Sequence, residues 1–148
     1  NHPAWSPDGK QIAYLYVQHG GLPIELWLMD ANGDNVIHLI DFPIAFTDVD
    51  WSPNGEWLAF VSGEKYDNCG DIYIVKPDGT NLTRLTNLSG CATDVTWSPD
   101  GKYLALVVRE IPDEMRCQIY IMDATGANLI AVGEEEELRI EDIDWGLP

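Results

Sequence analysis

The chain has 148 residues, of which 45% are hydrophobic and 10% aromatic, which is enough for an ordered domain with a core and excludes wholesale disorder. Its 25 acidic and 8 basic residues give a formal net charge of −17. This charge repels phosphate backbones and anionic lipids, so it argues against nucleic-acid and membrane partners and favours basic proteins, basic peptides or cations. A plainer interpretation is that the charge only keeps a β-rich protein soluble.

A Trp-Ser-Pro-Asp/Asn-Gly phrase recurs along the chain. It begins at Trp5, Trp51 and Trp97, 46 residues apart, and a degenerate fourth copy begins at Trp145. Repetition at a fixed period of this size indicates an array of like structural units. Ser, Pro, Asp and Gly in succession suit a tight type I turn, because Pro presets φ and Gly accepts a conformation that a side chain resists. Each tryptophan should therefore end one strand, and a second strand should follow the turn.

Aligning the three copies predicts four strands in each repeat. The first strand ends at the tryptophan. The third runs into an Asn-Gly, Asp-Gly or Thr-Gly turn, and the first two of these are strong hairpin signals. In the first repeat the second, third and fourth strands are expected at 12–17, 26–30 and 36–40. In the second repeat they are expected at 58–62, 72–76 and 82–86. In the third repeat they are expected at 104–108, 119–123 and 129–132.

The two middle strands of each repeat are apolar at consecutive positions, which predicts cover on both faces. No stretch has a helical period, so the cover must come from neighbouring sheets, as in the blades of a β-propeller. Small residues at one shared position, Ala13, Ala59 and Ala105, would let blades approach closely. A parallel β-helix is the competing fold, but its repeats are shorter and lack two hairpin turns.

We therefore predict an all-β fold, a partial or half propeller of three four-stranded antiparallel blades plus one extra inner strand. Blade one is expected to cover 1–47, blade two 48–93 and blade three 94–141, and residues 142–148 would start a further blade.

The repeat resembles that of the TolB-type (WD-like) propeller family. The resemblance rests on Trp-Ser-Pro-Asp-Gly-Lys at 97–102, Ile-Tyr-Ile-Met-Asp at 119–123 and Arg-Leu-Thr at 84–86. It implies a propeller of usually six or so blades, found in periplasmic and secreted proteins and in front of peptidase domains, so a periplasmic or extracellular location is expected. The chain departs from the family in having three blades, and at 131–133, where Ala-Val-Gly replaces Arg-Leu-Thr.

Two faces of such blades differ in sequence. The Ser-Pro-Asp-Gly and Asn-Gly turns form one face, the turn face, which is nearly invariant between repeats. The variable connections form the opposite face, the loop face, where function is expected. Its acidic residues predict a docking surface for a basic partner or a cation site, or else an ordinary solvated surface. They are Glu64, Asp67, Asp71, Glu110, Asp113, Glu114, Glu134, Glu135, Glu136 and Glu137.

Three further carboxylates, Asp48, Asp94 and Asp142, each lie three residues before a tryptophan. These groups would lie near the mouth of the central channel of a propeller. A ring of them there would hold calcium, which prefers several oxygen ligands. The alternative is that each aspartate caps its loop by accepting backbone N–H bonds. No other metal or cofactor is expected.

The three cysteines, Cys69, Cys91 and Cys117, match no zinc-binding spacing. All are expected on the loop face, where a Cys69–Cys91 disulfide ranks ahead of Cys91–Cys117. Three free thiols are the alternative. A bridge would favour a location outside the cytoplasm.

The sequence offers no catalytic constellation. The repeated serines belong to turns, no Gly-x-Ser-x-Gly elbow is present, and the histidines lie in three different settings. We therefore expect a non-catalytic scaffold that binds a protein or peptide, of basic character, through the acidic loop face. The alternatives are the gating propeller of a prolyl-oligopeptidase-like peptidase and a calcium-containing propeller hydrolase.

Three blades are too few to close a propeller, which needs about four to eight. The outer faces of blades one and three would therefore expose apolar surface that drives association. We expect either a homodimer that completes a six-bladed ring or the remainder of a longer chain. The sequence shows no initiating Met or signal peptide, which indicates a mature product or an excised piece.

Overall fold

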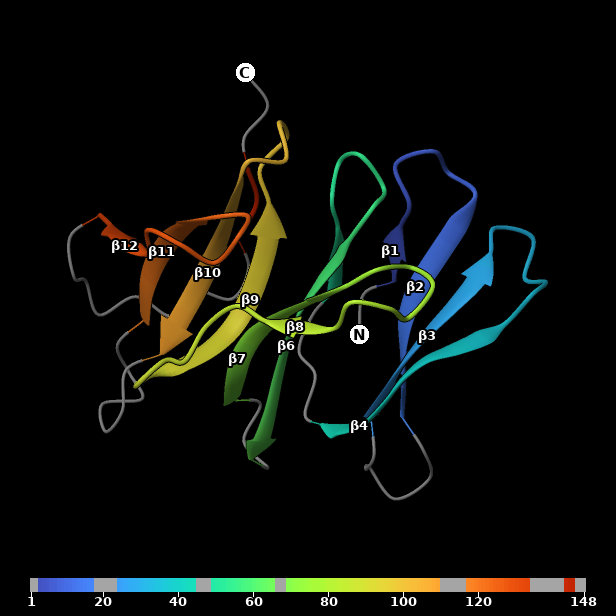
Figure 1. The fold of residues 1–148 in the computed structure, drawn as a ribbon, viewed down its shortest axis with the longest axis horizontal. Helices are drawn as coiled ribbons and strands as arrows, with labels where there is room; N and C mark the ends of the chain where they lie inside the picture. Colours follow the sequence, from blue (N-terminus) through green and yellow to red (C-terminus); the bar gives the residue numbers. More distant parts are fainter. Residues whose placement is uncertain are drawn as a thin grey trace.

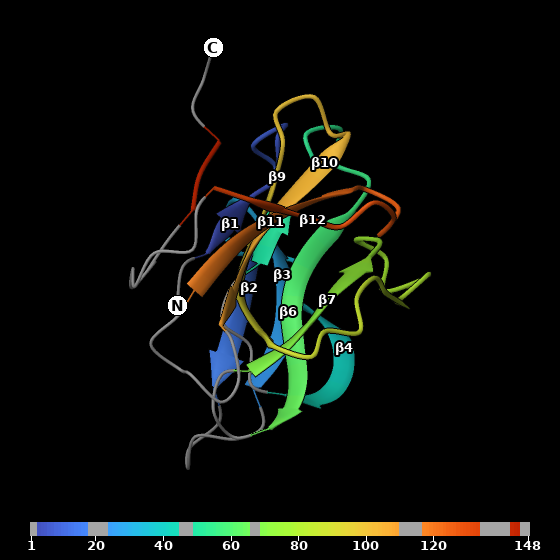
Figure 2. The same cartoon turned by 90° about the vertical axis from the view of Figure 1, so that its left-hand side faces the viewer.

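The computed structural model of the chain is all-β, as predicted. It describes residues 3–17, 24–44, 49–65, 69–109, 117–133 and 143–145, and these contain twelve strands and no helix. Within these ranges, accordingly, no helix is long and apolar enough to cross a membrane. Figure 1 shows three antiparallel arrays standing side by side along the molecule. Seen from the side of the third array, they stack one behind another (Figure 2). This is the arrangement of propeller blades.

Each array corresponds to one predicted repeat. The strands of blade one are β1 (Ala4–Trp5), β2 (Gln11–Val17), β3 (Ile24–Asp30) and β4 (Ile37–Ile44). Those of blade two are β5 (Val49–Trp51), β6 (Leu58–Lys65), β7 (Cys69–Val75) and β8 (Thr83–Arg84). Those of blade three are β9 (Cys91–Trp97), β10 (Tyr103–Arg109), β11 (Cys117–Asp123) and β12 (Ile130–Val132).

Strand pairing joins blades two and three into one sheet. Blade one is a separate four-stranded sheet, whereas the strands of the other two blades form a continuous eight-stranded sheet. The junction is one antiparallel pair between β7 and β9, Gly70–Ala92. On the opposite edge of β7, a Cβ atom on Gly70 would lie 2.2 Å from the carbonyl oxygen of Ser62 in β6, so only glycine fits this position.

Several strand bounds differ from those predicted. β9 begins at Cys91, inside the range predicted for blade two, because its first residues continue the ladder to Arg109 of β10. β4 and β6 extend beyond their predicted ends, whereas β8 has two residues instead of five. The segment 143–145, expected to be the end of an extra inner strand, has no strand geometry.

The Ser-Pro-Asp-Gly turns form as predicted. In the first repeat the N–H of Gly9 donates to the carbonyl of Ser6 at 2.8 Å, and Gly9 has a φ of +69°. The hydroxyl of Ser6 donates to Asp8 at 2.8 Å and accepts the backbone N–H of Gln11 at 2.9 Å. The second and third repeats make the same contacts around Ser52 and Ser98. This shared network explains why the turn phrase is repeated so closely.

The core lies between the blades. Leu26 and Leu28 of blade one pack with Leu58 and Phe60 of blade two, and all four side chains are almost fully buried. The opposite face of blade two packs on blade three in the same way, through residues that include Val61, Ile72, Leu104 and Leu106. Burial of each such side chain contributes about 1.5–3 kcal/mol. Ala13 and Ala59 are fully buried in these interfaces, as expected of positions that allow close approach.

Indole hydrogen bonds link neighbouring inner strands at Trp51 and Trp145, whereas the buried indole N–H of Trp97 has no partner among the described residues. The indole N–H of Trp51 donates to the carbonyl of Ala4 in blade one at 3.1 Å. The indole of Trp145 donates to the carbonyl of Thr96 in blade three at 3.4 Å. Although 143–145 is not a strand, it therefore occupies the position of a next inner strand.

Candidate binding face

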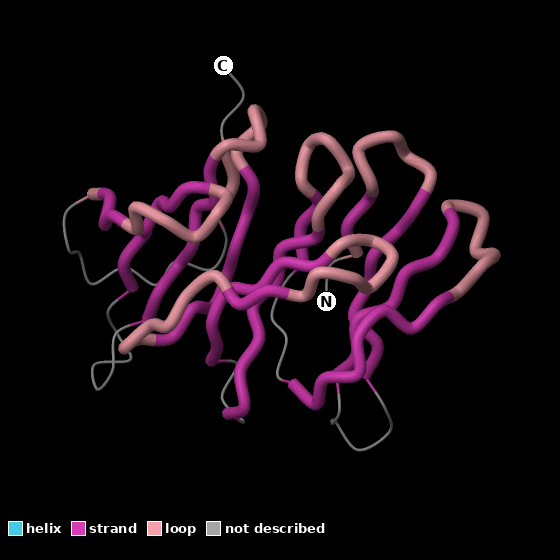
Figure 3. The backbone as a smooth tube through the Cα atoms, in the orientation of Figure 1, coloured by secondary structure: helices cyan, strands magenta, loops and turns pink. Residues whose placement is uncertain are grey.

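The loop face and the turn face lie at opposite edges of the blades. Figure 3 shows the β1–β2, β5–β6 and β9–β10 turns along the upper edge, whereas β2, β6 and β10 run toward the lower one. The connection from β8 to β9 also reaches the lower edge, so it belongs to the loop face.

Most of the acidic candidates lie outside the part of the chain that the structure describes, so their role stays a prediction. Asp71 is the exception. The others, whose side chains are not described, are Glu64, Asp67, Glu110, Asp113, Glu114, Glu134, Glu135, Glu136 and Glu137.

Asp71 forms its described hydrogen bonds within blade two, and its docking role stays a prediction. Its Oδ1 accepts the hydroxyl of Thr86 at 2.8 Å and the backbone N–H of Leu88 at 2.9 Å. Its Oδ2 accepts a bond from the guanidinium of Arg84 at 2.5 Å, and the same guanidinium nitrogen donates to Asn87 at 2.9 Å. The carboxylate is therefore neutralised within blade two, and it holds the segment that leaves β8.

The residue directly before the Leu-Trp-Leu or Ile-Tyr-Ile run of the third strand has this bridging role in another repeat too. Gln118 occupies the position of Asp71 in blade three, and its amide donates to the carbonyl of Val132 in the outer strand at 2.9 Å. In blade one the position is Glu25, which accepts the indole N–H of Trp27 at 2.9 Å. A polar residue at the same position of all three repeats was the signal that could have revealed a structural function.

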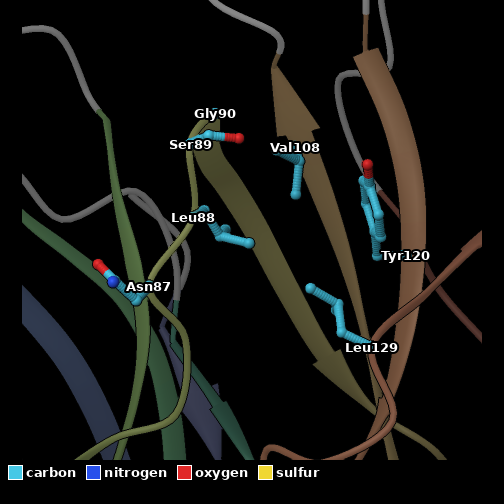
Figure 4. A pocket seen from close by; sticks show the side chains of 7 residues that line it. All are labelled: Asn87, Leu88, Ser89, Gly90, Val108, Tyr120 and Leu129. Atoms are coloured by element: carbon cyan, nitrogen blue, oxygen red, sulfur yellow. The ribbon is translucent and has the colours of Figure 1, made fainter.

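A cavity of about 460 Å³ opens beside the segment that Asp71 holds, between blades two and three. Figure 4 shows that Leu88, Val108 and Leu129 point into this interblade cavity and that the ring of Tyr120 forms one wall. The amide of Asn87 points away from it, toward its bond with Arg84. None of the lining residues was predicted as a site residue, because they come from β10, β11 and two separate connections. They are Asn87, Leu88, Ser89, Gly90, Val108, Tyr120 and Leu129.

Gly90 fixes one edge of the cavity. A Cβ atom there would lie 2.7 Å from the carbonyl oxygen of Arg109 and 2.8 Å from a methyl group of Val108. The absence of a side chain lets the connection between the blades lie directly against β10. The cavity is thus bounded by a segment that is held by Asp71 at one end and packed on β10 at the other.

The predicted calcium ligands are only partly described. Asp94 is buried, and its two oxygens accept the backbone N–H groups of Val95 at 2.8 Å and of Ile143 at 3.0 Å. This is the capping role given as the alternative. Asp48 and Asp142 lie outside the described residues, and within those residues no group of three or more His, Cys, Asp or Glu side chains is placed to hold a metal.

A carboxylate that sequence reasoning passed over, Asp50, links blades two and three. Its Oδ2 accepts the hydroxyl of Thr96 at 3.0 Å and the backbone N–H of Trp97 at 2.8 Å. Burial raises the pKa of the Asp50 carboxyl above its ordinary value of 3.8, and the charge of Asp144 acts in the same direction, against the hydrogen bonds from Trp97 and Thr96. The contact that Asp50 makes between blades two and three therefore depends on the protonation of its carboxyl group.

The cysteines take two states. Cys91 is disulfide-bonded, and Cys117 is a free thiol. The side chain of Cys69 lies outside the described part, so the predicted Cys69–Cys91 pairing stays a prediction. The backbone pair Gly70–Ala92 directly follows both residues and brings their strands together.

Comparison with known proteins gives one family and several similar folds. The model of the TolB β-propeller domain matches residues 1–142. A protein assigned as TolB from Agrobacterium tumefaciens aligns with a TM-score of 0.75 and 23% identity over 86% of this chain and 47% of its own. TolB from Acinetobacter baumannii aligns with a TM-score of 0.71 and 25% identity, over 87% of this chain and 31% of its own. A puromycin hydrolase aligns with a TM-score of 0.66 and 21% identity, over 89% of this chain and 21% of its own.

The chain therefore spans less than half the length of either TolB structure. Among curated proteins, none matches its sequence at a significant level.

Proposed function

The chain belongs to the TolB β-propeller domain family, and from this premise we propose that it is a non-catalytic scaffold that binds a basic protein or peptide through its loop face. The observation that carries the proposal is the contrast between the two faces. The turn face repeats one hydrogen-bond network three times, whereas the loop face differs between blades and holds the interblade cavity. A rigid scaffold with one variable face is typical of binding proteins.

Charge complementarity supports a basic partner. The chain carries a net charge of −17, and one of its eight basic residues, Arg84, is already paired with Asp71. Arg84 therefore offers little repulsion to a basic partner. A partner rich in Lys and Arg would be attracted and oriented by this field, most strongly at low salt.

A titration with the peptide acetyl-Lys-Lys-Gly-Leu-Gly-Lys-Lys-amide tests the proposal. Reversal of the loop-face charges in a Glu110→Lys/Glu134→Lys variant should weaken binding about tenfold, since each reversal turns attraction into repulsion. The matched control reverses two exposed turn-face carboxylates, Asp34→Lys/Glu56→Lys, and should change affinity less. Equal effects of the two variants would show that only net charge matters and would contradict loop-face binding.

We also propose that a second copy of the chain covers the outer face of blade one and so completes a six-bladed ring. Trp51 and Trp97 are 5% and 7% exposed because a preceding blade covers them, whereas Trp5 at the same repeat position is 56% exposed. The face around Trp5 therefore has the composition of an interblade contact. Further blades of a longer chain are the other source of such a contact.

The proposed location is periplasmic or extracellular. The disulfide at Cys91 supports an oxidising compartment, and so does the membership in the TolB family.

A second candidate function is the propeller of a hydrolase. The fold similarity to a puromycin hydrolase, of which this chain would cover 21%, supports it. A parent reading frame that continues into an α/β-hydrolase domain with a nucleophile elbow would favour this function over the scaffold.

A further inference from the structure

We propose that the interblade cavity is the pocket for one large apolar side chain of the basic peptide. The inference rests on the proposed function, and it adds the anchor that the loop face would recognise.

The cavity has the size and lining of a ligand site. Its volume of about 460 Å³ lies within the range of about 300–1,000 Å³ that is common for such sites. Leu88, Val108 and Leu129 converge on the cavity, and Tyr120 supplies an aromatic wall (Figure 4).

The walls of the cavity are fixed before any ligand arrives. Asp71 accepts bonds from Thr86 and Leu88, so the segment after β8 cannot collapse toward β11 without losing them. At the other end, Gly90 packs directly against Arg109 of β10. A preformed pocket binds more tightly than one that must be ordered on binding.

The lining combines apolar side chains with polar groups, which suits an apolar side chain carried on a peptide backbone. None of the seven lining residues carries a charged side chain. The hydroxyl groups of Tyr120 and Ser89 belong to the lining and each can both donate and accept, which suits the N–H and C=O groups of a peptide backbone. Since the chain as a whole has a net charge of −17, Lys or Arg residues on both sides of the anchor complete the match.

The test uses a series of acetyl-Lys-Lys-Gly-X-Gly-Lys-Lys-amide peptides in which X is Leu, Phe or Ala. The Leu and Phe peptides should bind at least about tenfold more tightly than the Ala peptide, because their side chains bury several more CH₂ groups. A glutamate-flanked Leu peptide and N-acetyl-leucine amide serve as probes of the flanking charge and of the peptide chain.

Two variants locate the anchor. Ser89 is exposed at the edge of the cavity, and its hydroxyl points toward Val108, so Ser89→Trp should fill the opening and reduce the affinity of the Leu peptide to that of the Ala peptide. The control, Ala127→Trp, adds the same bulk at an exposed turn-face position and should leave the preference unchanged.

The outcomes separate this inference from the function on which it rests. If no lysine-flanked peptide binds, both are wrong. If all of them bind equally well, or if Ser89→Trp keeps the preference for Leu, the scaffold function stands and the pocket assignment is overturned. Binding of the glutamate-flanked peptide or of N-acetyl-leucine amide as tightly as the lysine-flanked Leu peptide would overturn the assigned partner chemistry.

Discussion

Asp50 holds a carboxylate between two inner strands, where both its hydrogen bonds and its charge affect stability. Because burial raises its pKa in the folded chain, the folded state holds the proton more tightly than the unfolded state does. Its contribution to the free energy of unfolding is therefore greatest below pH 3.8 and is lost as the pH rises through the raised value.

We predict that Asp50→Asn keeps an oxygen acceptor for the N–H of Trp97 and removes this loss. The variant should gain stability relative to the native chain as the pH rises from below 3.8 to neutrality. Urea unfolding midpoints measured across this range would show the gain. Asp50→Ala is the control, because it leaves Trp97 without its acceptor and should destabilise the chain at every pH. A difference between Asp50→Asn and the native chain that does not vary with pH would contradict the prediction.

The turn carboxylates have the opposite pH dependence. A hydrogen bond from the side chain of Lys10 lowers the pKa of Asp8 to about 2, and Lys102 does the same for Asp100. Their contribution is present above pH 3.8 and is lost as the pH falls toward about 2. The comparison between Asp50→Asn and the native chain cancels this shared effect, since both keep the turns intact.

Among the elements, the Ser-Pro-Asp-Gly turn depends most directly on one backbone conformation. Gly101 has a φ of +69° between β9 and β10, and the nearest atom to an added Cβ would be 3.6 Å away, so there is space but an unfavourable φ. We predict that Gly101→Ala lowers the free energy of unfolding by about 1–2 kcal/mol.

Asparagine provides the matched comparison for Gly101→Ala. The chain itself places Asn35, Asn81 and Asn128 at φ values of 50° to 58°. Gly101→Asn should therefore cost less than Gly101→Ala, although its side chain is larger. Denaturant unfolding of both variants would measure the difference. If Asn proved the more costly, space rather than φ would limit this turn.

Strands and turns were predictable from the sequence where the three repeats agree. They were not predictable where they depend on contacts between side chains that are far apart in the chain. The turns and middle strands follow from phrases that recur every 46 residues. β8 ends at Arg84, and beyond it the hydroxyl of Thr86 accepts the N–H of Ile72 and donates to Asp71, which no local pattern indicates. The interblade cavity likewise combines β10, β11 and two connections, so only the fold assembles it.

At the scale of the whole molecule, the outer face of blade one determines how the chain associates. We predict that the 148-residue chain runs in solution at twice its mass of 16.5 kDa, because Trp5 and Tyr16, which are 56% and 49% exposed, need a covering blade. Sedimentation equilibrium would measure the mass. Trp5→Glu should yield monomers, and Val36→Glu, at an exposed residue in the turn after β3, should not.

A folded monomer of the native chain would contradict the proposal of a second copy. A monomeric native chain that forms a ring only when joined to further blades would assign the contact to a longer chain instead. Either result is visible in the same measurement.

The single backbone pair between Gly70 and Ala92 has a consequence for how the molecule comes apart. It makes blades two and three one hydrogen-bonded sheet, whereas blade one is attached to them mainly by side-chain packing and by single bonds such as that from Trp51 to Ala4. Units that share a ladder tend to open together, and units joined by packing open separately. Amide protons of β2 and β3 should accordingly exchange with deuterium sooner than those of β6, β7 and β10, so that the chain sheds its first blade as one cooperative step before the rest unfolds.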